Sequence, residues 1–239
     1  MRPIQAKFRS AAVSLAAVAL LAAGCGVSDN DVKPGVAAEV EGQQLSLSKV
    51  DKAVQDYCAL AATNPQAQAA PVALVRAQFV VGWTQAVAVD DLAPEHGVPL
   101  PAEQIDRTSV TDEWGALGTI DDDNYDTFEF LTWIKQRLTD PVAQLGADES
   151  GGRGDDAIEA GIALITKWLD DHDVSFNPVF GTYDATTGVF SGDPLSVPVS
   201  SEAKGASNTA AMTPEQVAKL PADQRCGPAA APAAVVPQG

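Results

Sequence analysis

The sequence has few of the residues on which common catalytic and metal sites are built. Its only histidines are His96 and His172, and its only cysteines are Cys25, Cys58 and Cys226. Neither Cys58 nor Cys226 has a second cysteine or a histidine at metal-ligand spacing, so a zinc site or a histidine-based triad would lack parts. A Gly-x-Ser-x-Gly elbow and a His-Glu-x-x-His helix are also absent. We therefore expect no catalytic residue, no bound metal and no cofactor.

Basic residues are scarce as well. Lys and Arg number 15 against 32 Asp and Glu, which gives a formal net charge of −17. A chain of this charge is repelled by nucleic acid and by anionic lipid head groups, so neither is expected as a direct partner. The run Asp121-Asp122-Asp123 does not make a calcium loop, which needs acids at alternate positions and a closing Glu. We interpret it as a solvated loop that starts a helix.

Apolar residues, in contrast, are concentrated at the N-terminus. A basic segment with Arg2, Lys7 and Arg9 precedes the short apolar run from Ala11 to Ala23, so residues 1–24 are predicted to be a signal peptide. Its removal would change the formal charge to −20. The sequence Leu21-Ala22-Ala23-Gly24-Cys25 then resembles a bacterial lipobox, with Ala22 where that motif prefers Leu.

The lipobox resemblance implies diacylglycerol on the Cys25 thiol and cleavage just before it. The chain would then be held at the outer face of the cytoplasmic membrane, with residues 25–35 as a polar tether and the acyl chains as its membrane contact. The alternative is an ordinary secreted protein with a chance cysteine.

Lipidation of Cys25 is directly testable. Mass spectrometry of the mature N-terminal peptide should show an acylated Cys25, because processing at the lipobox leaves the modified cysteine first. An unmodified thiol at this position, in a protein released to the medium, would contradict the prediction.

Two cysteines remain for a disulfide. Outside the cytoplasm an even number of cysteines favours pairing, so we predict a Cys58–Cys226 bond. A short helix from Thr213 to Leu220 precedes Cys226, with Thr213 as N-cap, Pro214 at its first position and Gln216 at its third. The bond would fold this helix back against the first helix of the domain.

The most apolar stretch after the leader runs from Pro71 to Leu92, and residues 77–89 carry no charge. A helix that is apolar almost all round belongs in a core or in a membrane. Arg76 and two glutamines would lie within a span of ~20 residues, which disfavours the membrane. We interpret the stretch as the core helix. Its broad apolar face comprises Val72, Val75, Phe79, Val80, Trp83 and Val87.

Periodicity and capping signals place other elements around this helix. Before it we expect a strand, tight turn and return strand over residues 36–47, and a helix capped by Ser48 that runs to about Ala62. After it we expect helices through Ile105 to Leu117, from Asn124 to Leu145 with Pro141 bending the end, and after Asp155 or Asp156 with a face of Ile158, Gly161, Ile162, Ile165, Trp168 and Leu169. A strand from Val174 to Gly181, an extended segment from Tyr183 to Ser200 and an Ala/Pro-rich tail over 201–239 follow.

Trp133 is placed unusually. The amphipathic face of its helix contains Phe128, Leu131 and Ile134, and Trp133 falls on the other side, near Arg137. It either packs on a neighbouring element or is an exposed aromatic side chain that grips apolar partners. In the second case Trp114 and Trp83 are further candidate contacts.

The order of motifs over residues 36–105 resembles the SurA N-terminal domain, the chaperone part of SurA/PrsA-type extracytoplasmic foldases. The matching pieces are Val40-Glu41-Gly42, Leu47-Ser48-Lys49-Val50-Asp51, His96-Gly97-Val98 and Pro101 to Ile105. The family usually has Asn where this chain has Glu41. The Asn177-Pro178-x-x-Gly181 end of the late strand resembles the closing strand of lipoprotein relatives, which returns beside the first strand.

The resemblance implies a mainly α fold over residues 36–200, with a small β element made by the N-terminal strand and the late returning strand. The parvulin-type isomerase domain that often follows in this family is not expected, because residues 106–172 are helical in pattern. The expected function is a lipid-anchored chaperone-like protein that binds unfolded or partly folded exported polypeptides without catalysis. The alternatives are an accessory envelope lipoprotein that docks one partner and, less favoured, a degenerate prolyl isomerase.

Overall fold

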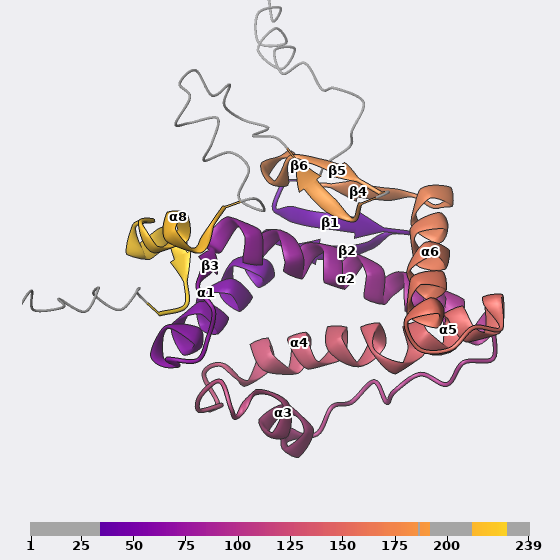
Figure 1. The fold of residues 1–239 in the computed structure, drawn as a ribbon, viewed down its shortest axis with the longest axis horizontal. Helices are drawn as coiled ribbons and strands as arrows, with labels where there is room; N and C mark the ends of the chain where they lie inside the picture. The colour runs from indigo at the N-terminus through magenta and orange to yellow at the C-terminus, as the bar shows by residue number, and fades with distance from the viewer. Residues whose placement is uncertain (1–33, 186, 192–211, 229–239) are drawn as a thin grey trace, which may run out of the picture. The chain divides into compact units, whose positions relative to one another are not determined.

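The computed structural model describes residues 34–185, 187–191 and 212–228. The signal peptide, Cys25, nearly all of the tether and much of the tail therefore lie outside the described residues. Within them the fold is mainly α with small sheets, as expected (Figure 1).

The predicted β element is present. β1 (Val36–Val40) pairs antiparallel with β2 (Gln43–Ser46) through a turn in which Glu41 and Gly42 have φ values of 47° and 79°. Two positive φ values in a row are typical of the two-residue hairpin turns that match strand twist. β4 (Val174–Phe176) pairs antiparallel with the other side of β1, which gives the order β2-β1-β4. The prediction of a late strand returning beside the first is therefore confirmed.

The first helix starts earlier than predicted. α1 (Leu47–Thr63) is capped by Ser46, whose side-chain oxygen accepts a hydrogen bond from the backbone nitrogen of Lys49 at 3.1 Å. Ser48, the predicted cap, lies inside the first turn. Asp51, three residues after Ser48, made Ser48 look like the cap. The structure shows that Ser46 has the extended backbone of an N-cap residue.

The core helix is α2 (Val72–Glu95), which follows the short strand β3 (Ala70–Pro71). In Figure 1 the β2-β1-β4 sheet lies on one side of α2 and α4 on the other, and α2 contacts both. Among the described residues α2 alone is long and apolar enough to span a membrane by those two measures, and 44% of its apolar window is buried inside the protein. These contacts favour the core interpretation.

α3 (Arg107–Trp114) begins after Asp106, whose carboxylate accepts a hydrogen bond from the backbone nitrogen of Ser109 at 2.9 Å. Ile105, which we predicted inside this helix, therefore precedes it. In the loop that follows, Asp121 Oδ1 accepts hydrogen bonds from the backbone nitrogens of Asp123 and Asn124. The acidic run thus forms a turn before the next helix.

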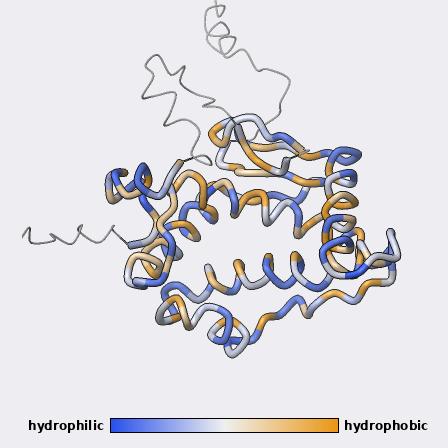
Figure 2. Tube along the Cα trace, viewed as in Figure 1, coloured by the Kyte–Doolittle hydropathy of each residue, from blue (hydrophilic) through white to orange (hydrophobic). Residues whose placement is uncertain are grey.

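The single helix predicted over Asn124 to Leu145 is in fact two, α4 (Tyr125–Leu138) and α5 (Asp140–Ser150). The backbone breaks at Thr139, at φ −97° and ψ −102°. Pro141 falls in the first turn of α5, where its missing N–H costs no helical bond. The apolar periodicity continues across the break, and in Figure 2 α4 alternates between hydrophobic and hydrophilic colours along its length.

α6 (Asp155–Asp171) corrects two predictions. Gly154, not Asp155 or Asp156, occupies the N-cap position. Ile158 and Ile162, predicted to face the core, have 44% and 48% of their surface exposed. α6 instead packs on α5 through small residues, and its buried residues are Ala157, Gly161, Ile165, Trp168 and Leu169.

The late strand is shorter than predicted and a hairpin follows it. A 3₁₀ turn, η1 (Pro178–Phe180), replaces the end of the expected strand, since Asn177 Oδ1 accepts from the backbone nitrogen of Val179. β5 (Thr182–Asp184) and β6 (Val189–Ser191) then form an antiparallel hairpin in the segment predicted as extended. The remainder of that segment, residues 192–200, lies outside the described residues.

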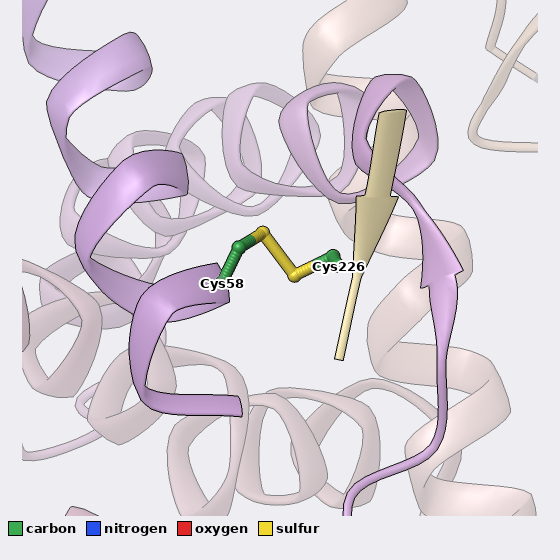
Figure 3. The surroundings of a disulfide bond; sticks show 2 residues. All are labelled: Cys58 and Cys226. Carbon is green, nitrogen blue, oxygen red and sulfur yellow. A yellow bond between two sulfur atoms is a disulfide. The ribbon is translucent and has the colours of Figure 1, made fainter. Parts of the chain in front are cut away.

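Part of the predicted tail packs on the domain. α8 (Pro214–Ala218), which has the predicted capping box at Thr213, leads through η3 (Ala222–Gln224) to β7 (Arg225–Cys226), and β7 pairs with β3. α8 contacts β3, so it is β7 rather than the helix that carries Cys226 to α1. Figure 3 shows Cys226 and Cys58 pointing toward each other, with a Cα–Cα distance of 4.6 Å and the predicted bond in place.

Candidate functional site

An open cleft of about 960 Å³ lies where α1, α2, α4 and the segment before α3 meet. Its lining mixes aromatic and aliphatic side chains with charged ones. The lining residues are Ser48, Lys49, Lys52, Ala53, Trp83, Glu103, Gln104, Ile105, Asp126, Thr127, Glu129, Phe130 and Trp133. Two of the three predicted contact residues, Trp83 and Trp133, are therefore brought together here.

α4 lines the cleft with Asp126, Thr127, Glu129, Phe130 and Trp133, and Phe130 also belongs to the buried core. Asp126, Phe130, Trp133 and Arg137 recur at spacings of four, three and four residues, which places them on one side of a helix. Phe128, predicted on the opposite face, is fully buried. Trp133 lies on a different side of α4 from Phe128, as predicted, and it is partly buried against the core, which agrees with the first of the two alternatives for its role.

The position of the Trp133 side chain is set by its contact with Arg137. Its ring, half-buried, lies against the guanidinium of Arg137, with 4.3 Å from Cζ to the ring centroid. Arg137 is only 2% exposed, and its Nε donates to Asp90 Oδ1 on α2 at 2.7 Å. Cation–π contact of this kind is worth more when the cation is removed from water. The ring position therefore depends on a buried bridge between α4 and α2.

Burial of the Asp90–Arg137 bridge is costly for both of its charged groups. Burial raises the pKa of the Asp90 carboxyl, and the neighbouring Arg137 charge opposes this without cancelling it. One guanidinium nitrogen of Arg137, Nη1, is buried without a hydrogen-bond partner in the described part of the chain. Removing one partner of a buried pair leaves an uncompensated charge, so both residues support the cleft as a unit.

The floor of the cleft is apolar. Trp83 comes from α2 and is 8% exposed, and Phe130 from α4 and Ile105 from the segment before α3 are each 7% exposed. Lys49 lies with Nζ 4.4 Å from the centroid of the Phe130 ring. Because these three side chains are mostly covered, Trp133 offers the largest free aromatic surface in the cleft.

The lysines and the carboxylates of the rim come from different elements, and Lys52 on α1 is near enough to Asp126 on α4 for the two charges to interact. The α1 side carries Lys49 and Lys52, and Lys52 Nζ is held by Asp56 at 2.8 Å, a contact that also raises the lysine pKa. The opposite side carries the carboxylates of Glu103, Asp126 and Glu129. Within the described ranges none of these three carboxylates forms an ion pair or a side-chain hydrogen bond.

Trp114, the third predicted contact, does not line the cleft. Its Nε1 donates to Thr132 Oγ1 at 2.9 Å, and its ring packs edge-on against Tyr57 and tilted against Phe128. A tryptophan with its N–H bonded and its ring covered on two sides is a packing residue. Trp114 joins α3 to α1 and α4.

The histidines are engaged elsewhere. His96 contacts Asp148, and His172 stacks on the Trp168 ring with its Nδ1 2.7 Å from the Trp168 carbonyl oxygen. Neither lines the cleft. No cluster of histidine, cysteine, aspartate and glutamate suited to a metal ion occurs among the residues that the structure describes.

Sequence reasoning did not find Phe130, Lys49 or Glu129 as site residues. The available signal was the placement of Glu129 and Trp133 one helical turn apart, with Phe130 beside them, away from the Phe128 side of α4. Lys49 gave no signal of its own, because its role depends on α1 and α4 meeting in space.

The chain matches no protein-family model, no curated protein and no solved structure. The functional interpretation therefore depends on the residues of the cleft, together with the order of motifs over residues 36–105.

Proposed function

We propose that this protein binds extended apolar segments of non-native polypeptides in the cleft and performs no chemistry on them. The observation that carries the proposal is a single one. A cleft of about 960 Å³ has an aromatic floor and a charged rim, which is the pattern of a site that excludes water from apolar groups while staying soluble when empty. A small closed surface would instead have favoured an accessory protein with one fixed partner.

The expected affinity is weak. Burial of apolar surface yields ~25 cal/mol per Å², and association costs remove much of the gain for the few side chains that such a cleft covers. Binding on the micromolar scale follows. Weak binding suits a protein that must release its clients without an energy source.

The proposal includes the location inferred from the lipobox. A lipid on Cys25 would hold the cleft at the outer face of the cytoplasmic membrane, where exported polypeptides emerge unfolded. After removal of residues 1–24, 12 Lys and Arg remain against 32 Asp and Glu, and this net charge of −20 would keep a loaded complex soluble and favour basic clients.

Trp133→Ala should weaken suppression of client aggregation by about tenfold in the concentration required, because it removes the largest free aromatic surface of the cleft. The thermal midpoint should change little, since the Trp133 side chain is partly exposed and Asp90 still pairs with Arg137. Light scattering of a denatured client with the purified full chain measures the first effect, and calorimetry measures the second.

Ile162→Ala is the matched control, because it removes an exposed apolar side chain from α6, outside the cleft. It should leave suppression unchanged. A large fall in the midpoint of the Trp133 variant would show Trp133 to be a core residue and would contradict the proposal. Measurable prolyl isomerisation by the full chain would contradict the statement that the protein performs no chemistry.

A further inference from the structure

We propose that the cleft selects segments in which an apolar and a basic side chain are separated by one residue of an extended chain. This inference depends on the proposed function and narrows it from apolar segments in general to a defined sequence pattern. It follows from which charged side chains of the rim lack an ion-pair partner, and from the spacing of the carboxylates and aromatic rings along α4.

Of the two lysines on the rim, Lys52 is paired with a carboxylate, and Lys49 contacts an aromatic ring and forms no ion pair among the described residues. Lys52 donates to Asp56 and to the carbonyl oxygen of Asp123, and Lys49 lies over the Phe130 ring. The carboxylates of Glu103, Asp126 and Glu129 have no comparable partner in the described part of the chain. Three carboxylates against the single unpaired lysine, Lys49, leave a net negative charge in the cleft, as in the chain as a whole. A client side chain that complements it is basic.

The spacing on α4 specifies where that basic side chain belongs. Asp126 precedes Phe130 by four residues and Glu129 precedes Trp133 by four, and all four side chains line the cleft. Four residues of helix advance about 6 Å along the axis. In an extended chain, side chains two residues apart point to the same side and lie about 6.6 Å apart. For a client chain that lies along α4, an apolar side chain on the Phe130 or Trp133 ring places the side chain two residues further along the client beside Asp126 or Glu129.

Side chains at the neighbouring position of the client point the opposite way. A basic residue directly adjacent to the apolar one would face solvent rather than Glu129, and an acidic residue at the second position would meet like charge. The cleft therefore discriminates by both sign and spacing. A flexible acidic surface without the aromatic floor would discriminate by sign alone.

The test uses the purified full chain and four fluorescein-labelled peptides, followed by anisotropy. The first repeats Leu-Ser-Lys-Ser, so that each lysine is two residues from a leucine and on the same side of the extended chain. The second has the same composition with each lysine adjacent to a leucine and on the other side of the extended chain. The third and fourth replace the lysines of the first by glutamate and by glutamine.

We expect the first peptide to bind about two- to fivefold tighter than the glutamine peptide, which is the range of a partly exposed ion pair. The permuted peptide should bind like the glutamine peptide, and the glutamate peptide should bind most weakly. Glu129→Gln should remove most of the advantage of the first peptide. Glu159→Gln, the same change at an exposed position on α6, should leave it intact.

Equal binding of the first and permuted peptides overturns the spacing, and equal binding of the first and glutamine peptides overturns the preference for basic residues. In both cases the proposed function stands, because the peptides still bind. Absence of binding by all four, the neutral peptide included, overturns the proposed function itself.

Discussion

Replacing Cys58 and Cys226 together by alanine should lower the free energy of unfolding by roughly 4–5 kcal/mol. The bond joins residues 168 positions apart, and by chain entropy a closed loop of this length is strongly stabilising. For a chain of this size the midpoint of thermal unfolding should fall by roughly 10–15 °C. Calorimetry of the native and double-variant proteins measures the difference.

The disulfide also stabilises the protein locally, because it fixes residues 212–228 to α1. β7 is two residues long and contributes only a short ladder with β3, so the covalent bond is the main link between residues 212–228 and α1. Protease cleavage should therefore appear first in this segment when the bond is removed. Reduction of the native protein, without mutation, is the control and should reproduce both effects. Free alkylation of Cys58 and Cys226 without reductant would show that the bond is absent.

Gly146→Ala should destabilise the protein by about 3 kcal/mol, at the upper end of what is usual for overpacking. A Cβ at this position would lie 1.7 Å from the carbonyl oxygen of Ala157 and 2.4 Å from the backbone nitrogen of Gly161. Both atoms are backbone, so α5 and α6 must move apart. The midpoint of thermal unfolding should fall by roughly 6–12 °C.

Gly82→Ala is the matched control, since Gly82 is also a glycine inside a packed helix. Its Cβ would meet only side-chain atoms, with Ile134 Cγ2 at 3.1 Å and Leu138 Cδ1 at 3.8 Å. The gain in helix propensity, about 0.5–1 kcal/mol, offsets the small adjustment that those side chains need. Equal midpoints for the two variants would contradict the close packing of α5 on α6.

Locally encoded features were predictable from the sequence. The β1–β2 hairpin follows from alternation around Glu41-Gly42, the capping box at Thr213 from three residues, and the core position of α2 from its uncharged run. The return of β4 beside β1 was a non-local feature, and it came from the family resemblance rather than from periodicity.

Features set by contacts between distant helices were not predictable. The apolar period of residues 124–145 runs unbroken, so only the turn at Thr139 reveals two helices. Ile158 and Ile162 continue the apolar stripe of α6, but the close approach of Gly146 and Gly161 decides which side of α6 is buried.

The cleft is also formed by contacts between helices that are distant in the sequence. The sequence showed that Trp133 lies on a different side of its helix from Phe128, but its neighbours Trp83, Phe130 and Lys49 come from three helices whose meeting has no local signal. Trp114 has the same residue type and a similar helical setting, yet it packs between α1 and α4. Residue type alone did not separate the two roles.

The four tryptophans allow the central claim, binding of apolar segments in the cleft, to be measured in one experiment. Two-dimensional ¹H–¹⁵N NMR resolves one indole N–H signal for each of Trp83, Trp114, Trp133 and Trp168. Titration of the full chain with an unfolded apolar peptide should shift the signals of Trp83 and Trp133 together, because both rings line the cleft. The signal of Trp114, whose indole N–H donates to Thr132, and that of Trp168, stacked on His172, should stay in place. Shifts at Trp114 and Trp168 with Trp83 and Trp133 unchanged would contradict binding in the cleft.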